Sequence, residues 1–234
     1  MKIAHAPYEH IPDIITKYSI KKQLDISLPR RQIKELSFPS NTTEELVQSH
    51  VNYLQKRNFD PKYLQIKYHI KSIGPASERA WSNRILIPYL FKERIVTFTA
   101  RDSTEFEWRP RYKACLPEES EIPIDHILYN INSVKEIAVI VEGPTDVWRM
   151  GDGFVAMGGL QWNSQRIYLL KDCKQVFIWP DKEHAALLFW EKLAHSLSFI
   201  KDVRFVELSE GDPGSLDEDS ARNFRREIFG RKYR

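Results

Sequence analysis

The spacing of hydrophobic positions predicts helices and a hairpin in the first half of the chain. In residues 40–57 apolar side chains recur at helical spacing, which predicts an amphipathic helix, and a shorter helix is predicted at 60–66. Residues 84–90 and 94–100 are rich in β-branched and aromatic side chains, and the polar pair at 92–93 between them predicts a tight turn. The pattern therefore indicates two helices followed by a β-hairpin.

Short apolar runs separated by helix-like stretches begin at residue 137. The run at 137–141 is apolar throughout, as expected of a strand that is buried on both faces. Further strands are predicted at 154–158, 175–179 and 203–208, with helices at 162–171 and 183–197. Because strands that alternate with helices form parallel sheets, the predicted fold is α/β. It comprises a parallel sheet flanked by helices and, before it, a smaller mixed α/β subdomain.

Proline content and charge divide the chain into three predicted segments. Prolines interrupt residues 1–40, which are predicted to be an irregular lead-in. Residues 41–113 form a predicted basic subdomain with 13 basic and 8 acidic side chains, whereas residues 114–220 carry 9 basic and 19 acidic ones. The predicted parallel-sheet domain spans 114–234 and ends in a basic helix or tail. This asymmetry fits a protein that holds a polyanion and divalent cations, although solvated faces also differ in charge by chance.

Composition narrows the class of protein. Apolar residues make up 42% of the chain and charged residues 29%, as in ordinary globular proteins. No apolar run approaches the roughly 20 residues of a membrane-spanning helix, and the N-terminus lacks the apolar stretch of a secretory signal. Cys115 and Cys173 are too few for a disulfide framework or a cysteine-rich zinc site. We expect a cytoplasmic protein that contacts no membrane and holds no zinc.

Carboxylates follow three of the predicted strands in the second half. Glu142 and Asp146 come after the first strand, Asp181 and Glu183 after the third, and Asp212 after the last. Because ligands of a parallel α/β sheet bind at the carboxyl ends of its strands, we expect these acids to meet at one edge. The acids would repel one another without cations, and oxygen ligands favour Mg²⁺ or Mn²⁺ over zinc. Paired metals of this kind serve phosphoryl transfer.

Each acidic segment also has a structural interpretation. Gly143 could simply end a strand in a sharp turn, and Asp181 and Glu183 could begin a helix, where the helix dipole favours acids. The pattern at 215–218 fits a helix cap, so the acids at 217–219 receive no catalytic role. The joint placement of acids after buried strands is what favours a site. Surface or packing roles are predicted for His184 and His195, and core positions for Trp148, Trp162, Trp179 and Trp190.

Several segments resemble motifs of Toprim-domain DNA primases. IAVIVEGPTDVWRMG resembles the first Toprim motif, an apolar strand that ends in Glu-Gly with an Asp closely following. IWPDKEHAA resembles the second motif, and EGDPGSL resembles the Asp-Pro stretch after the next strand. Upstream, VNYLQKRNFDPKYLQIKYHI and the succession RILIPYL, RIVTFTARD, RYKACLP and ILYN are similar to the polymerase core of bacterial-type primases. The resemblance covers residues 44–220 in the right order, and it is to a phage-type core without zinc-binding and helicase domains.

The resemblance implies roles for individual residues. Glu142 matches the acid near the attacking 3′-hydroxyl, as a metal ligand or general base. Asp146, Asp181 and Glu183 match metal-ligand positions, and Asp212 matches the acid of the Asp-Pro step. The basic residues that match positions on nucleotide phosphates and the template strand are Arg84, Arg101, Arg111 and Lys113. Each of these could instead be an ordinary surface charge.

The function implied by the resemblance is Mg²⁺-dependent synthesis of short RNA primers on single-stranded DNA from nucleoside triphosphates. The implied partners are a replicative helicase and a separate zinc-binding or template-recognition subunit. Among the departures from the family pattern, Glu183 stands where Asp is usual, and Gly214 stands where bacterial primases often carry another acid. Two alternatives stay open, a Toprim nuclease that uses water as the nucleophile and a non-catalytic accessory that binds single strands.

Overall fold

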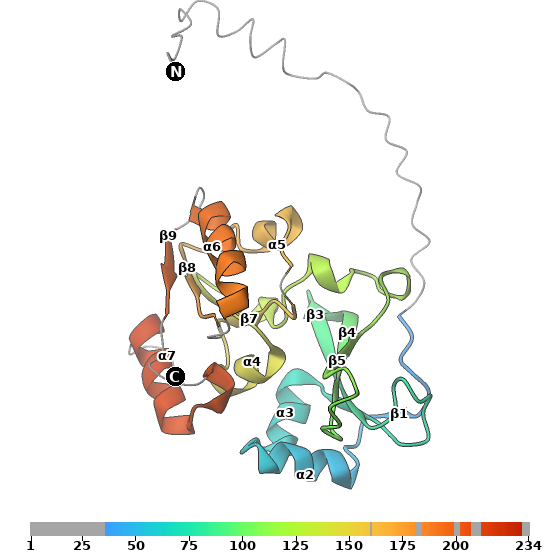
Figure 1. The fold of residues 1–234 in the computed structure, drawn as a ribbon. Coiled ribbons are helices and arrows are strands. Elements are labelled where there is room, and N and C mark those ends of the chain that lie inside the picture. Colours follow the sequence, from blue (N-terminus) through green and yellow to red (C-terminus); the bar gives the residue numbers. More distant parts are fainter. Residues whose placement is uncertain (1–35, 160, 181–183, 199–201, 207–211, 231–234) are drawn as a thin grey trace, which may run out of the picture. The chain divides into compact units, whose positions relative to one another are not determined.

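The computed structural model describes residues 36–159, 161–180, 184–198, 202–206 and 212–230. All of them belong to one compact unit, Ile33–Arg234. Most of the predicted lead-in, and the candidate ligands Asp181 and Glu183, lie outside the described residues. Within the unit, one antiparallel and one parallel sheet are joined by a chain of short 3₁₀ helices (Figure 1).

The antiparallel sheet has five strands in chain order. They are β1 (Thr42–Thr43), β2 (Lys71–Ile73), β3 (Arg84–Phe91), β4 (Arg94–Asp102) and β5 (Tyr112–Ala114). Helices α2 (Gln48–Lys56) and α3 (Pro61–Tyr68) lie between β1 and β2 in the chain. The predicted hairpin of β3 and β4 is confirmed. Its turn residues Lys92 and Glu93 have φ of 50° and 64°, the left-handed pair that a tight hairpin turn requires.

The predicted helix at 40–57 is wrong in its first part. Thr42 and Thr43 pair with β2, because β-branched residues fit the pleat of a sheet edge, and α2 begins only at Gln48. The amide N–H of Val47 then donates to Ser72 Oγ at 2.9 Å, which ties the start of α2 to β2. The helix predicted at 60–66 is confirmed as α3, whose N-cap is Asp60.

The second sheet has four strands, all parallel. Their order is β7 (Phe154–Ala156), β6 (Ile137–Val141), β8 (Gln175–Ile178) and β9 (Asp202–Phe205). The helices of this half are α4 (Pro144–Met150), α5 (Ser164–Leu169), α6 (His184–Ser198) and α7 (Glu218–Phe229). The 3₁₀ helices are η2 (Pro117–Glu119), η3 (Ile124–His126), η4 (Ile131–Ser133) and η5 (Pro213–Ser215). The structure confirms the α/β fold with a parallel sheet flanked by helices.

The start of α7 differs from the predicted cap at 215–218. Asp217 is the N-cap, and its side chain accepts from Ser220 N at 2.8 Å. Ser215 instead joins Asp212 in capping η5. Aspartate accepts a helix-start N–H as well as serine does, so the sequence pattern alone does not separate the two registers.

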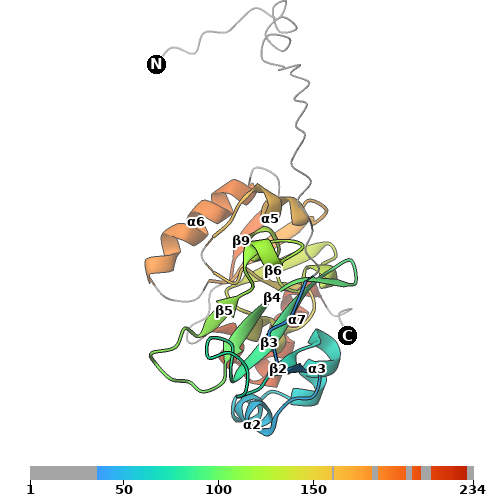
Figure 2. The ribbon, with the colours of Figure 1, turned by 90° about the vertical axis from the view of Figure 1, so that its right-hand side faces the viewer.

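One hydrophobic core joins the two sheets. Alternate residues of β3, such as Ile85, Ile87 and Tyr89, pack in the same cluster as β6, whereas Leu86 faces a second cluster on the other side of the antiparallel sheet. Trp148, Trp179 and Trp190 are buried in the joint core and Trp162 packs against it, as predicted. Figure 2 shows α2 and α3 at one end of this unit and α6 at the other. Among the described residues, no helix is both long and apolar enough to cross a membrane.

Helix α4 is tied to both helices of the first half. Arg149 Nη2 donates to the carbonyls of Arg57 at 3.1 Å and Asn58 at 3.2 Å, and Tyr68 Oη donates to the carbonyl of Val147 at 3.2 Å. Figure 1 shows α4 between the parallel sheet and these helices. These hydrogen bonds connect the helices of the first half to a helix of the second half. The domain boundary at residue 113 therefore stays a prediction.

A buried histidine makes stability depend on pH. His50 of α2 is fully buried, with Nδ1 2.7 Å from Ser72 Oγ. Burial lowers its pKa from 6.5 to about 4, although the Asn83 backbone and the Asp102 carboxylate act in the opposite direction. Because the unfolded state takes up the proton first, stability is lost as pH falls from 6.5 toward 4, by roughly 2–3 kcal/mol. Urea unfolding of wild type and His50→Gln at pH 7 and pH 4.5 measures this loss. An equal loss in both proteins would assign the pH dependence to other groups, and His195→Gln, a surface change, is the matched control.

Candidate active site

The candidate site begins where β6 gives way to α4. The chain turns at Glu142 and Gly143, and Gly143 N donates to Asp146 Oδ2 at 2.8 Å, which closes the first turn of the helix. Asp146 is only 6% exposed and lies at the positive end of the helix dipole. Glu142 is half-buried at the end of the strand, where its carbonyl accepts from Gly158 N at 2.9 Å. The two acids therefore stand at the carboxyl edge of the parallel sheet, as expected.

The segment that carries Asp212 meets α4 at Gly214. A Cβ on Gly214 would stand 2.7 Å from Asp146 Oδ1 and 3.4 Å from Asp212 Oδ1. Asp212 Oδ1 also accepts from Ser215 N at 2.7 Å, which fixes this carboxylate. The structure thus brings Asp146 and Asp212 to the same glycine. Any side chain at 214 would intrude on the Asp146 carboxylate, which gives a steric reason for glycine at this position.

The strand that precedes the third acidic segment in the chain ends beside β6. Ile178 of β8 pairs with Ile140 of β6, and Trp179 N donates to the carbonyl of Ile140 at 2.9 Å. Asp181 and Glu183 follow outside the described residues, so their role as metal ligands stays a prediction. In the part of the chain that the structure describes, no three acidic, histidine or cysteine side chains are grouped to hold a metal.

Arg101 approaches this edge from the antiparallel sheet. It lies opposite Tyr112 in the pairing of β4 with β5, and its Nη1 donates to Tyr112 Oη at 2.6 Å while its Nε donates to Tyr53 Oη. Tyr112 Oη and Thr145 Oγ1 of α4 each lie 3.8 Å from the point where a Cβ on Gly143 would stand. One phenol group therefore separates the Arg101 guanidinium from the start of α4.

Arg101 keeps its charge in this buried position. Burial acts to lower the pKa of Arg101, but the phenol groups of Tyr112 and Tyr53 outweigh it and raise the pKa above its ordinary value. Burial raises the pKa of Tyr112, and the Arg101 charge acts in the opposite direction. The site thus joins a permanent cation to a set of carboxylates. That combination suits a ligand with both metal-bound and free phosphate oxygens.

Tyr112 also lines a cavity of about 400 Å³. The cavity is walled by basic and aromatic side chains, and none of the described residues that line it is acidic. The charged and aromatic members are Arg79, Arg84, Arg109, Lys113, Trp108 and Tyr112. Through Tyr112, this cationic cavity adjoins the start of α4, which carries Asp146.

The four predicted basic residues differ in their burial and in their contacts. Arg84 is 2% exposed, and its guanidinium donates to the carbonyls of Ala80, Ala100 and Pro110 at 3.0–3.3 Å. It therefore braces the cavity wall, and burial lowers its pKa. Lys113 lies in the cavity with its ammonium 4.7 Å from the Trp81 ring centre. Arg111 is exposed and lines a different hollow beside Asp102. Their roles on phosphate stay predictions.

Sequence reasoning missed the tyrosines and the loop residues of this site. Tyr53 and Tyr112 position Arg101, while Arg79, Trp108 and Arg109 line the cavity. A signal was available, because basic and aromatic residues alternate in the segment WRPRYK at 108–113, a pattern common in nucleic-acid contacts.

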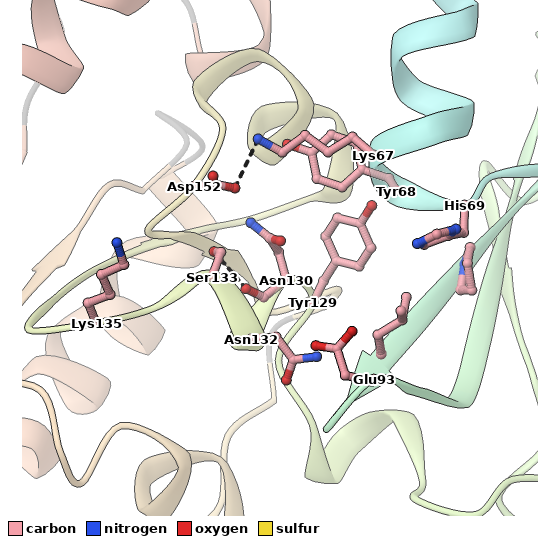
Figure 3. A pocket seen from close by; sticks show the side chains of 12 residues that line it. Lys67, Tyr68, His69, Glu93, Tyr129, Asn130, Asn132, Ser133, Lys135 and Asp152 are labelled. Carbon is pink, nitrogen blue, oxygen red and sulfur yellow. Dashed lines mark hydrogen bonds and ion pairs between the residues drawn. The ribbon is translucent and has the colours of Figure 1, made fainter. Parts of the chain in front are cut away.

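A larger cavity, of about 430 Å³, lies away from these residues. Figure 3 shows Lys67, Tyr129, Asn130 and Asp152 in its wall, and none of the predicted site residues lines it. Lys67 forms an ion pair with Asp152 at 2.9 Å, so the positive charge of this lysine is already neutralised within the fold. We assign no chemistry to this cavity.

Comparison with solved structures places the fold among primase catalytic cores. The zinc-binding and RNA polymerase domains of the Aquifex aeolicus primase superpose with a TM-score of 0.67 and 20% identity, over 80% of this chain and 57% of that one. The DnaG catalytic core matches with a TM-score of 0.61 and 19% identity, over 78% and 70%. The primase fragment of the bacteriophage T7 primase-helicase protein matches with a TM-score of 0.53 and 13% identity, over 85% and 78%.

These likenesses concern the fold. The chain has the fold of bacterial and phage primase catalytic cores, as the motif resemblance implied. It spans just over half the length of the Aquifex chain. Models of protein families and curated protein sequences give no match.

Proposed function

We propose that this protein is a metal-dependent nucleotidyltransferase that copies single-stranded DNA into short RNA primers. One observation carries the proposal: Tyr112 lies between a cationic cavity on the antiparallel sheet and the start of α4, where Asp146 and Asp212 approach the same glycine. Nucleotidyl transfer needs both features, since acids hold the metal and basic groups hold the triphosphate and the template. The primase-core fold supports the same conclusion.

The carboxylates fit Mg²⁺ or Mn²⁺. Asp146 and Asp212 both place a carboxylate oxygen beside Gly214, and oxygen is the donor that these hard cations prefer. In the proposed site Asp146, Asp181, Glu183 and Asp212 are ligands. When bound, the metal neutralises charge on the reacting phosphate and lowers the pKa of the attacking hydroxyl.

The chain's own residues take three further roles in the proposal. Glu142, at the end of β6, accepts the proton of the primer 3′-hydroxyl or holds the metal that activates it. Lys113 and Arg111 contact phosphate groups of the nucleotide or the template. Arg101, held by its two tyrosines, presents a fixed positive charge to the triphosphate, while Arg84 keeps the cavity wall in place.

Substrates and partners follow from the same proposal. The substrates are single-stranded DNA and nucleoside triphosphates. The Aquifex chain includes a zinc-binding domain and the T7 fragment derives from a primase-helicase protein. We therefore propose a replicative helicase and a zinc-binding or template-recognition module as partners, acting in the cytoplasm of a bacterium or of a phage-infected cell.

Incorporation of labelled ribonucleotides tests the proposed activity. We expect alkali-labile products of a few nucleotides on single-stranded DNA with Mg²⁺, and none on the same strand with EDTA. The helicase is added in a parallel reaction because it concentrates primase on its template. Template-independent products, or products that survive alkali, would contradict RNA primer synthesis.

A further inference from the structure

The loop between β4 and β5 presents two aromatic side chains to solvent. Trp108 is 67% exposed and Phe106 is 54% exposed. Their rings lie within 15° of parallel with centroids 5.9 Å apart, so they stack on each other. Neither residue belongs to either core cluster. Packing of the fold therefore does not explain this pair, and paired exposed aromatic rings are typical of a binding surface.

Two guanidinium groups accompany the Trp108 ring. The Cζ atoms of Arg79 and Arg109 lie 5.7 Å and 5.8 Å from the ring centre. Arg109 is fixed by its ion pair with Asp102 at 3.2 Å and by a hydrogen bond to the carbonyl of Ser82 at 2.9 Å. Arg79 is exposed. Aromatic faces beside arginines match single-stranded nucleic acid, whose bases stack while its phosphates seek positive charge.

Acidic residues of the loop are largely neutralised within the fold. Glu105 pairs with Lys56 at 3.1 Å, and Asp102 pairs with Arg109. Glu107 is a further exposed acid, but it lines the neighbouring hollow and not the cationic cavity. The Trp108 ring therefore borders a cavity in which basic residues dominate.

Trp108 adjoins the candidate active site, whereas Phe106 lines the neighbouring hollow. Trp108 lines the same cavity as Tyr112 and Lys113, and Tyr112 reaches the start of α4. A base stacked on Trp108 would thus lie on a strand whose neighbouring phosphates can enter the cationic cavity. This arrangement rests on the proposed function, which makes that strand the DNA template.

We propose that Phe106 and Trp108 form a stacking platform for bases of the single-stranded DNA template. Arg79 and Lys113 hold the adjacent phosphates. The platform recognises base faces without reading their sequence, because every base has a π-face. It adds contact on a strand that the metal site alone does not bind.

Binding of two oligonucleotides separates stacking from charge. Fluorescence anisotropy is measured with a thymidine oligomer and with an abasic oligomer of equal length and charge. We expect Trp108→Ala to weaken binding of the thymidine oligomer by roughly 5- to 100-fold and to leave the abasic oligomer nearly unchanged. Trp108→Phe, which keeps an aromatic face, should recover most of the loss. Tyr168→Ala, which removes a similarly exposed ring on α5, is the matched control and should bind as wild type.

Two outcomes would overturn the platform. Equal affinity of wild type and Trp108→Ala for the thymidine oligomer would do so, and would point to a protein partner for the aromatic pair. Equal losses of affinity for the two oligomers would show that Trp108→Ala acts through charge or misfolding and not through base stacking. Ribonucleotide incorporation is measured separately with wild type: a protein that binds but incorporates nothing contradicts the proposed activity and leaves the platform result standing.

Discussion

Replacing Asp146 by asparagine is expected to lower ribonucleotide incorporation by about two to three orders of magnitude. The Asp146 carboxylate is buried between Gly143 and Gly214, and in the proposed site it is a metal ligand. Asparagine keeps a carbonyl oxygen that can accept from Gly143 N, so the first turn of α4 survives while the negative charge is lost. Initial rates at saturating Mg²⁺, together with a thermal melt, separate lost chemistry from lost fold.

Asp217→Asn is the matched control for that substitution. Asp217 also accepts a helix-start N–H, from Ser220, but it caps α7 and is exposed. Its variant should incorporate nucleotides within about twofold of wild type, as surface substitutions usually have small effects. Wild-type activity in Asp146→Asn would remove this carboxylate from the metal site.

Arg101→Met is expected to reduce both stability and activity. The substitution removes the hydrogen bonds that Arg101 donates to the hydroxyl groups of Tyr53 and Tyr112. Their loss at this buried arginine should lower the free energy of unfolding by about 2–3 kcal/mol. It also removes the positive charge beside the acids, for which we expect a further loss of incorporation on the order of 100-fold. Urea unfolding and incorporation rates measure the two effects on the same protein.

Two companion variants separate the effects of Arg101. Tyr112→Phe keeps the Arg101 charge but removes the hydroxyl that accepts from Arg101 and lies beside α4, so it should lose less activity than Arg101→Met. Lys113→Met removes a cavity charge that is not part of the tyrosine cluster, and it should flatten the salt dependence of single-strand binding by about 0.7 log units per tenfold salt. Arg101→Met with full activity and reduced stability would restrict Arg101 to a packing role.

Much of the fold could be predicted because periodicity and turn chemistry are local properties. The apolar run at 137–141 is a parallel strand, and Lys92 and Glu93 form the turn of the hairpin. The meeting of Asp146 with Asp212 was predictable as well, since parallel strands bring their carboxyl ends to one edge whatever the packing between them. The helix predicted at 40–57 begins only at Gln48, because Thr42 and Thr43 pair with a strand about thirty residues further along the chain. No local pattern reveals such a pairing.

The cationic half of the site depended on tertiary contacts. Arg101 lies opposite Tyr112 because β5 pairs with β4 after the loop at residues 103–111. The register of this pairing decides which basic residues line the same cavity. The same loop carries Trp108 away from the core, although its residue type alone favours burial. Arg84 had the right charge and position in the motif, yet its three bonds to backbone carbonyls became visible only in the fold.

Extension of a preformed RNA dinucleotide on single-stranded DNA tests the central claim most directly. The dinucleotide bypasses initiation, the step for which a separate zinc-binding module is proposed, and it supplies the 3′-hydroxyl that Glu142 would serve. With Mg²⁺ and labelled nucleoside triphosphates, we predict elongation by template-directed nucleotides, and poor or no synthesis when the dinucleotide is omitted. Degradation of the DNA without any incorporation would contradict this account and identify the acids as those of a nuclease.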